Sequence, residues 1–211
     1  MKREVQFPVI APILVAINGM IAIVSFEWPR GHISSEWFQA WAIIPEQPTF
    51  PQILTYWFLH FHLPHYLGVS ALLLVAGAYG EWRLSKKWIL GFYILGATVF
   101  ALASVVILVI FLYLFPSVVI LQWFSYGLNR HMVGSSAASF SVYGSLYPVV
   151  KPSHRPLYFS GLFIAILSPI IIFQTINIGD WAHLVVSFLA IGVSWVLYRR
   201  TSAALCRSSV L

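Results

Sequence analysis

Three polar side chains occupy matching positions in long uncharged stretches of the chain: His65, Ser136 and His183. Each lies 15 or 16 residues before the charge that ends its stretch. In chain order these charges are Glu81, Lys151 and Arg199. At about 1.5 Å of helical rise per residue, each side chain would lie roughly 22–24 Å from its charged end. If all three stretches cross a bilayer of roughly 30 Å in the same direction, a serine and two histidines meet in one plane. A serine beside a histidine is the minimum required for nucleophilic hydrolysis, so we predict an enzyme.

The composition predicts a membrane protein. Of the 211 residues, 60% are hydrophobic and 9% are charged, whereas soluble domains carry about 25% charged residues. The mean hydropathy is +0.85, and most uncharged stretches have about the length of one membrane-crossing helix. We therefore predict an all-α integral membrane protein, a six-helix transmembrane bundle that forms a single domain over residues 1–211. The predicted spans are residues 6–26, 54–80, 88–115, 134–150, 156–175 and 180–198, with an outer loop over 116–133.

The basic residues predict the orientation of these spans. Ten of the twelve lysines and arginines fall on the side that holds both termini, and Arg30 and Arg130 fall on the other. Because basic residues are enriched on the cytoplasmic side, we expect a multi-pass protein of a prokaryotic cell membrane with cytoplasmic termini. The net charge of +6 then reflects topology and contact with the lipid bilayer, and we expect no nucleic-acid partner. The outer stretch 27–50 is expected to anchor in the headgroup zone through its tryptophans, with substrate gating as the alternative.

The stretch around Ser136 reads HMVGSSAASFSVYGSLYP and is rich in small side chains. Small residues let helices approach closely within a membrane, so we expect this span in the bundle centre, with the second and sixth spans against it. Packing alone is the structural alternative, because serines in such helices often bond to the preceding turn. The matching depth of His183 favours Ser136 as a nucleophile.

His183 lies in the sequence GDWAHLVVSF, within the last predicted span. A histidine inside a membrane is costly and indicates function, although a structural hydrogen bond to a neighbouring helix is the alternative. Asp180 precedes it by three residues and shares its helix face. This carboxylate could orient the imidazole as in a triad, but a cap at the start of the helix is the favoured role.

Three histidines at close spacing invite a metal-site interpretation. His60, His62 and His65 fall within six residues, and imidazoles at such spacing can bind zinc or copper. No acidic or thiol ligand lies near them in the sequence. We therefore predict no metal and no cofactor.

Three segments carry motifs whose order and spacing are specific in combination. The second span begins with several histidines and ends in a glutamate. The fourth contains Gly-x-Ser, then an aromatic residue four positions and a glycine eight positions after the serine, and the sixth contains Ala-His. These residues are His65, Glu81, Gly134, Ser136, Phe140, Gly144, Ala182 and His183. Over residues 55–192 the chain resembles the rhomboid family of intramembrane serine proteases.

The resemblance implies a fold, an activity and a role for each matching residue. It implies a six-span bundle that cuts single-pass transmembrane proteins near the outer membrane surface, with the substrate helix entering between spans two and five. Ser136 would be the nucleophile and His183 the general base and acid. His65 and the backbone N–H of Ser136 would hold the oxyanion. The supporting residues would be Gly134 for close approach, Phe140 stacked on the His183 ring, and the motif's Gly144.

Two departures from the family pattern bear on turnover. The family usually has an asparagine four residues after the second-span histidine, where this chain has Val69. Loss of one oxyanion donor typically costs on the order of 10²–10³ in rate, and His62 is a candidate substitute. In addition, Ala137 replaces a usual glycine, and Val186 replaces a small residue that packs spans four and six together.

Two other functions stay open from the sequence alone. An inactive rhomboid-like protein would bind or escort transmembrane helices, and Val69 favours it, whereas the presence of both Ser136 and His183 argues against it. A transporter or channel would require paired intramembrane charges or inverted repeats, and the sequence shows neither. A sortase-like rhomboid that cuts C-terminal anchor segments has no dedicated signature here.

Overall fold

The computed structural model describes residues 7–43, 49–114, 134–173 and 178–208. This part of the chain is mostly helical, which confirms the all-α prediction apart from one short hairpin. The predicted outer loop 116–133 lies outside the described residues. The α-helices are α1 (Ile10–Ser25), α2 (Ser35–Trp41), α3 (Phe50–Thr55), α4 (Leu63–Arg83), α5 (Lys86–Leu114), α7 (Ser136–Ser145), α8 (Arg155–Phe173) and α9 (Ile178–Ser208). Short 3-10 helices are η1 (Tyr56–Phe58), η2 (Tyr147–Val149) and η3 (Pro152–His154), and the strands are β1 (Phe26–Glu27) and β2 (His32–Ile33).

Three described helices are long and apolar enough to cross a membrane. They are Leu63–Arg83 in α4, Lys86–Val106 in α5 and Ala182–Ser202 in α9, and α1 is a shorter apolar helix. These helices support membrane association.

The start of the second predicted span was wrong by about nine residues. The helix begins at Leu63, not near residue 54, and the preceding segment forms α3 and η1. Pro64 lies in the first turn of α4, where its missing N–H costs nothing, and His62 caps the helix by accepting the His65 N–H at 3.0 Å. The uncharged stretch continues across this boundary, and Pro64 was the local sign of it that the prediction did not use.

Two other boundaries also differ from the prediction. The fourth span, predicted over 134–150, is α-helical over Ser136–Ser145 and continues as η2, which contains Pro148. The last helix runs ten residues past the predicted end at 198, to Ser208.

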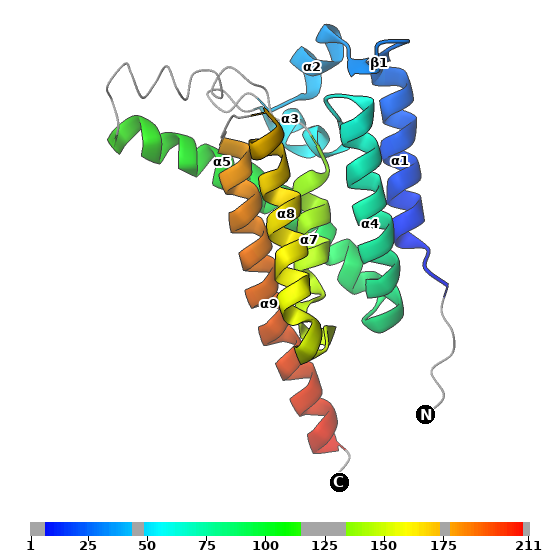
Figure 1. Cartoon of the computed structure of the whole chain (residues 1–211), viewed down its shortest axis with the longest axis vertical. Coiled ribbons are helices and arrows are strands. Elements are labelled where there is room, and N and C mark those ends of the chain that lie inside the picture. The colour runs from blue at the N-terminus through cyan, green and yellow to red at the C-terminus, as the bar shows by residue number, and fades with distance from the viewer. Residues whose placement is uncertain (1–6, 44–48, 115–133, 174–177, 209–211) are drawn as a thin grey trace.

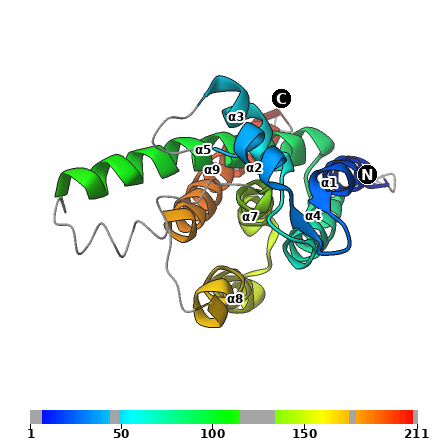
Figure 2. The same ribbon diagram turned by 90° about the horizontal axis from the view of Figure 1, so that it is seen from above.

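The helix α7 lies at the centre of the bundle (Figure 2), where it packs against α4, α5 and α9. This confirms the predicted central place of the serine-bearing segment. The start of α1 and the end of α9 lie at the lower end in Figure 1, whereas α2, α3 and the hairpin lie at the upper end. We call these the lower and upper ends below.

Glycines allow the close packing around α7. A Cβ added to Gly144 would lie 2.8 Å from the Ser187 carbonyl oxygen and 3.1 Å from Ala190 Cβ. A Cβ on Gly96 of α5 would lie 2.3 Å from Ser141 Cβ. The distances of 2.8 and 2.3 Å are shorter than the contacts that Cβ atoms make in proteins. Larger residues at Gly144 and Gly96 would therefore push α9 and α5 away from α7. The small side chains therefore position the helices that surround the serine.

A buried carboxylate fixes α1 against the lower end of α4. The two Glu81 oxygens accept the backbone N–H groups of Val9 at 2.7 Å and Ala11 at 2.8 Å. These N–H groups have no partner within their own helix, and a negative charge there is favoured by the helix dipole. Gly77, one turn earlier on α4, lets Ala11 come close to the α4 backbone.

The described part of the stretch predicted as an interfacial anchor, residues 27–43 and 49–50, lies at the upper end. An antiparallel pair, β1 and β2, precedes α2, which Ser34 caps by accepting the Trp37 N–H at 3.4 Å. Trp28 and Trp41 are exposed there. These indoles suit the headgroup zone of a bilayer.

Candidate active site

A glycine with an unusual backbone conformation starts the site. Gly134 has φ +121°, a value that side chains disfavour, and its N–H donates to the Tyr56 carbonyl at 2.9 Å. A Cβ there would lie 2.9 Å from the His65 ring, so the space is closed to larger residues. The close approach expected at Gly134 is thus present, and it turns the chain into the first turn of α7.

The two residues predicted as a dyad lie in contact. Ser136, the first residue of α7, places its Oγ 2.8 Å from Nε2 of His183 on α9. The two residues are 47 positions apart in the sequence, and their contact depends on the tight packing of α7 against α9. A hydroxyl and an imidazole at hydrogen-bond distance meet the geometric requirement for a base-activated nucleophile.

Two aromatic rings hold the imidazole of His183. The Phe140 ring lies 5.2 Å from it at an interplanar angle of 59°, so the predicted contact is present but the rings are tilted, not stacked. The Phe100 ring, on α5, lies closer to the His183 ring, with 4.9 Å between the ring centroids and an interplanar angle of 34°. Phe100 was missed, because it is one of several aromatic residues in an apolar stretch without a distinguishing pattern.

His65 borders the same small space as the Ser136 hydroxyl. The point where a Gly134 Cβ would stand lies 3.4 Å from Ser136 Oγ and 3.5 Å from His65 Nε2. His65 is in the first turn of α4. The serine and the two histidines therefore do meet at one level of the bundle, as their spacing predicts.

Another histidine of this segment, His62, has structural partners. His62 caps α4 and its ring lies 5.9 Å from that of His32. Partial burial and the neighbouring His32 lower the pKa of His62 below its ordinary value. Nothing in these contacts directs His62 at Ser136, so its suggested role as a substitute donor gains no support. Among the described residues, no group of three potential ligands lies close enough to hold a metal ion.

A second serine–histidine pair lies directly behind the first. Ser135 Oγ is 3.2 Å from His60 Nε2 and also accepts the Asn18 amide at 3.3 Å. The same amide lies 3.4 Å from the Tyr93 hydroxyl. This buried polar cluster joins α1, α5, the segment before α4 and the start of α7. It was missed, although Asn18 is the one amide in an otherwise apolar helix and marks the place.

The departures from the family pattern fall at buried positions. Val69 lies one turn after His65 on α4 and is buried, and its side chain has no hydrogen-bond donor. Ala137 and Val186 belong to one apolar cluster that also contains Phe100. Val186 therefore fills the space between α7 and α9 while Gly144 still keeps the helices close.

One predicted interaction falls outside the described residues. Asp180 belongs to α9, but its side chain is not among those described, so its capping role stays a prediction.

The backbone at the start of α7 also contributes to the electrostatics of the site. Ser136 begins α7, so its N–H lies at the positive end of the helix dipole, among the N–H groups that the helix itself does not use.

The site thus brings a hydroxyl, two imidazoles and the start of a helix together at one level of the bundle. The hydroxyl and one imidazole, those of Ser136 and His183, are in contact, and His65 borders the same space. No protein-family model matches the chain, and no curated protein matches it.

Proposed function

We propose that this chain is a rhomboid-type intramembrane serine endopeptidase that cleaves single-pass transmembrane proteins near the outer membrane surface. The observation that carries the proposal is the 2.8 Å contact between Ser136 Oγ and His183 Nε2, made by two helices that the sequence places far apart. The motif order around these residues supports the family assignment. The reaction needs no metal and no cofactor.

The proposed reaction proceeds by acyl transfer. Ser136 Oγ attacks the carbonyl carbon of the scissile peptide bond while His183 Nε2 takes the hydroxyl proton. The tetrahedral intermediate then collapses, the C–N bond breaks, and His183 gives the proton to the leaving amine. Water attacks the resulting ester with His183 again as base, which releases the new carboxyl terminus and restores Ser136. The phenylalanines on either side keep the imidazole in one orientation throughout.

The negative charge of the intermediate would be held by few donors. The Ser136 N–H lies at the start of α7, and His65 borders the same space. Val69 contributes no donor where the family usually has an asparagine. We therefore expect a slow enzyme, with a deficit on the order of 10²–10³ relative to a site with that additional donor.

The proposed membrane arrangement has six spans. In it, α4, α5 and α9 cross the bilayer together with α1, α7 and α8, and both termini are cytoplasmic in a prokaryotic cell. The upper end then faces outward, which is the end nearer to Ser136. Substrate helices enter between α4 and α8, the second and fifth spans.

The second candidate function is an inactive rhomboid-like protein that binds or escorts transmembrane helices. Val69 is the observation that favours it. The two functions differ in whether the Ser136 hydroxyl is chemically activated.

Labelling with a serine-reactive fluorophosphonate in detergent tests this activation. Wild-type protein is expected to become labelled, Ser136→Ala to stay unlabelled, and His183→Ala to label far more weakly. Ser139→Ala is a matched control on the same helix and should label like wild type. Equal labelling of all four proteins would refute the dyad, and no labelling of a folded wild type would favour the inactive helix binder.

A further inference from the structure

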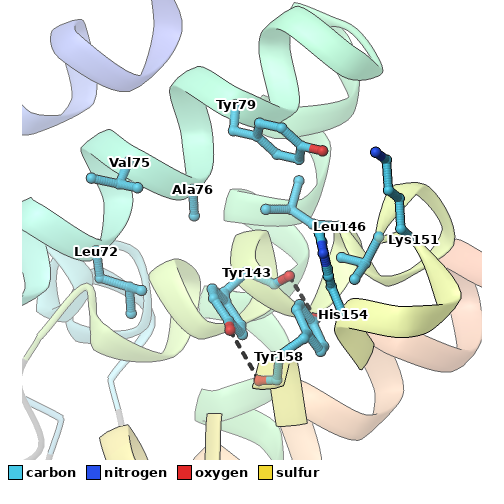
Figure 3. Close-up of a pocket in the computed structure, with 10 residues that line it drawn as sticks. Leu72, Val75, Ala76, Tyr79, Tyr143, Leu146, Lys151, His154 and Tyr158 are labelled. Carbon is cyan, nitrogen blue, oxygen red and sulfur yellow. Dashed lines mark hydrogen bonds between the residues drawn. The ribbon is translucent and has the colours of Figure 1, made fainter. Parts of the chain in front are cut away.

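A groove opens along residues 72–79 of α4, toward the end of that helix opposite to His65 (Figure 3). It has a volume of about 450 Å³, in the range of sites that hold small molecules. Its walls come from α4, the lower end of α7, and the segment that leads into α8. No residue of the proposed dyad lines it.

One wall of the groove is apolar and runs lengthwise along α4. Leu72, Val75, Ala76 and Tyr79 recur at helical spacing and present one face of α4 over two turns, about 10 Å. Val75 is 73% exposed, so this face is not covered by the bundle itself. The wall therefore offers an extended chain a straight apolar contact parallel to the membrane normal.

The opposite wall is held rigidly by a pair of tyrosines. The rings of Tyr143 on α7 and Tyr158 on α8 stack at 4.6 Å with an interplanar angle of 7°. Each hydroxyl donates to the other residue's backbone carbonyl, at 3.0 and 2.8 Å. These reciprocal bonds fix α8 to α7, so the groove has a defined width at this level.

The lower end of the groove is polar and basic. Figure 3 shows the Lys151 side chain at this end, near the Tyr79 hydroxyl, with His154 beside it. The Arg83 guanidinium lies 6.0 Å from the Tyr79 ring. The nearest acid along α4, Glu81, is buried and already bonded to α1. Among the described residues, Lys151 and Arg83 have no carboxylate within 4.0 Å.

We infer that this groove binds one anionic phospholipid from the leaflet at the lower end of the bundle. An acyl chain lies along Leu72, Val75 and Ala76, and the phosphate is bound by Lys151 with the Tyr79 hydroxyl and His154. Charge complementarity selects this occupant. An apolar chain ending in a fixed negative charge matches an apolar wall that ends in unpaired cations, whereas a transmembrane polypeptide in the orientation proposed above would bring mostly basic residues to that level. The inference does not depend on the proposed peptidase activity.

Native mass spectrometry of the full chain, released from detergent with added lipid, tests this site. Phosphatidylglycerol is the anionic probe and phosphatidylcholine the neutral one. We expect one phosphatidylglycerol per protein, bound in preference to phosphatidylcholine. Lys151→Gln should weaken its binding about fivefold, the loss expected for one basic residue near a membrane surface. Val75→Trp should weaken it about tenfold or more by filling the groove.

Matched controls separate this site from general lipid contact. Lys87→Gln removes an exposed lysine outside the groove, and Val106→Trp enlarges an exposed apolar residue on α5. Both should bind phosphatidylglycerol like wild type. Equal binding of the two lipids, or equal losses in Lys87→Gln and Lys151→Gln, would overturn the inference. Unchanged lipid binding in Val75→Trp with impaired capture of a transmembrane peptide would assign the groove to a polypeptide instead. Fluorophosphonate labelling of Ser136 reports on the peptidase proposal separately.

Discussion

Two adjacent serines at the start of α7 each face a histidine, yet their surroundings differ. Ser135 is fully buried, and its hydroxyl lies 3.2 Å from His60 and already accepts the Asn18 amide. Ser136 is 7% exposed as a residue, and within the described residues its hydroxyl bonds to His183 alone, at 2.8 Å. A nucleophile needs a free lone pair and access to a substrate. The comparison shows that contact with an imidazole is not sufficient to identify one.

The largest expected effect on the cleavage rate comes from replacing each of the two serines, in turn, by alanine. Ser136→Ala should reduce cleavage of a model transmembrane substrate on the order of 10⁴–10⁶, because no other group can form the acyl intermediate. Ser135→Ala should reduce it less than tenfold while lowering stability by about 1–3 kcal/mol, since Asn18 and His60 lose their partner. Cleavage rates and thermal unfolding of both variants provide the measurement. Similar cleavage by the two variants would contradict the distinction drawn between the serines.

The next effect concerns the hydrogen-bond donors that would hold the oxyanion formed at Ser136. The buried Ser135 forms no such intermediate. Val69→Asn should raise the cleavage rate up to about 10²-fold by adding an oxyanion donor one turn after His65. Val69→Leu is the matched control, because it changes the shape without adding a donor, and it should give no gain. Rates are compared at equal fluorophosphonate labelling. An asparagine variant that labels normally but cuts no faster would show that Val69 does not limit turnover.

A smaller effect is expected from the rings that orient His183. Phe100→Leu and Phe140→Leu should each lower kcat about tenfold with little change in KM, because the imidazole loses its fixed direction. Phe92→Leu is a suitable control, since Phe92 is as buried as Phe100 but belongs to a different cluster. An equal loss in the control would mean that general core packing, not ring orientation, accounts for the change.

The smallest effect is the pH dependence that the buried Ser135–His60 pair gives to the free energy of unfolding. Burial, together with the neighbouring His65, lowers the pKa of His60 from 6.5 to about 3. The unfolded chain therefore binds this proton first, so the stability contribution is complete above pH 6.5 and is lost as the pH falls toward 3. Between pH 7 and 6 this amounts to about 0.7 kcal/mol.

Thermal unfolding in detergent at these two pH values measures the change. His60→Asn should show a shallower pH dependence than wild type, whatever its absolute stability. Identical slopes for the two proteins would contradict the role of His60.

The common level of the candidate site residues can be predicted from the sequence, because each of the three uncharged stretches ends in a charged residue. Counting back from Glu81, Lys151 and Arg199 places three polar residues at one height, and the structure brings two of them into contact. The central position of α7 follows from its small residues in the same way. Both features depend on regular helical rise and on side-chain size, which are local properties.

Features that depend on partners from other helices could not be predicted. The boundary before α4 was missed because the uncharged stretch continues across it, although Pro64 in the first turn is typical of a helix start. Phe100 owes its role to the direction in which one face of α5 points, and nothing in its own neighbourhood distinguishes it. The pairing of Asn18 with Ser135 joins positions 117 residues apart, and only the packing of α1 determines it.

The carboxylate at the lower end of α4 has a consequence for the opposite end of the molecule. By accepting the N–H groups of Val9 and Ala11, Glu81 fixes the vertical position of α1, because sliding the helix by one residue would break both bonds. Seven residues beyond Ala11, about 10 Å higher, Asn18 then arrives level with Ser135. A single acid near one end of the bundle thus determines the height at which an amide meets the start of the serine helix near the other end.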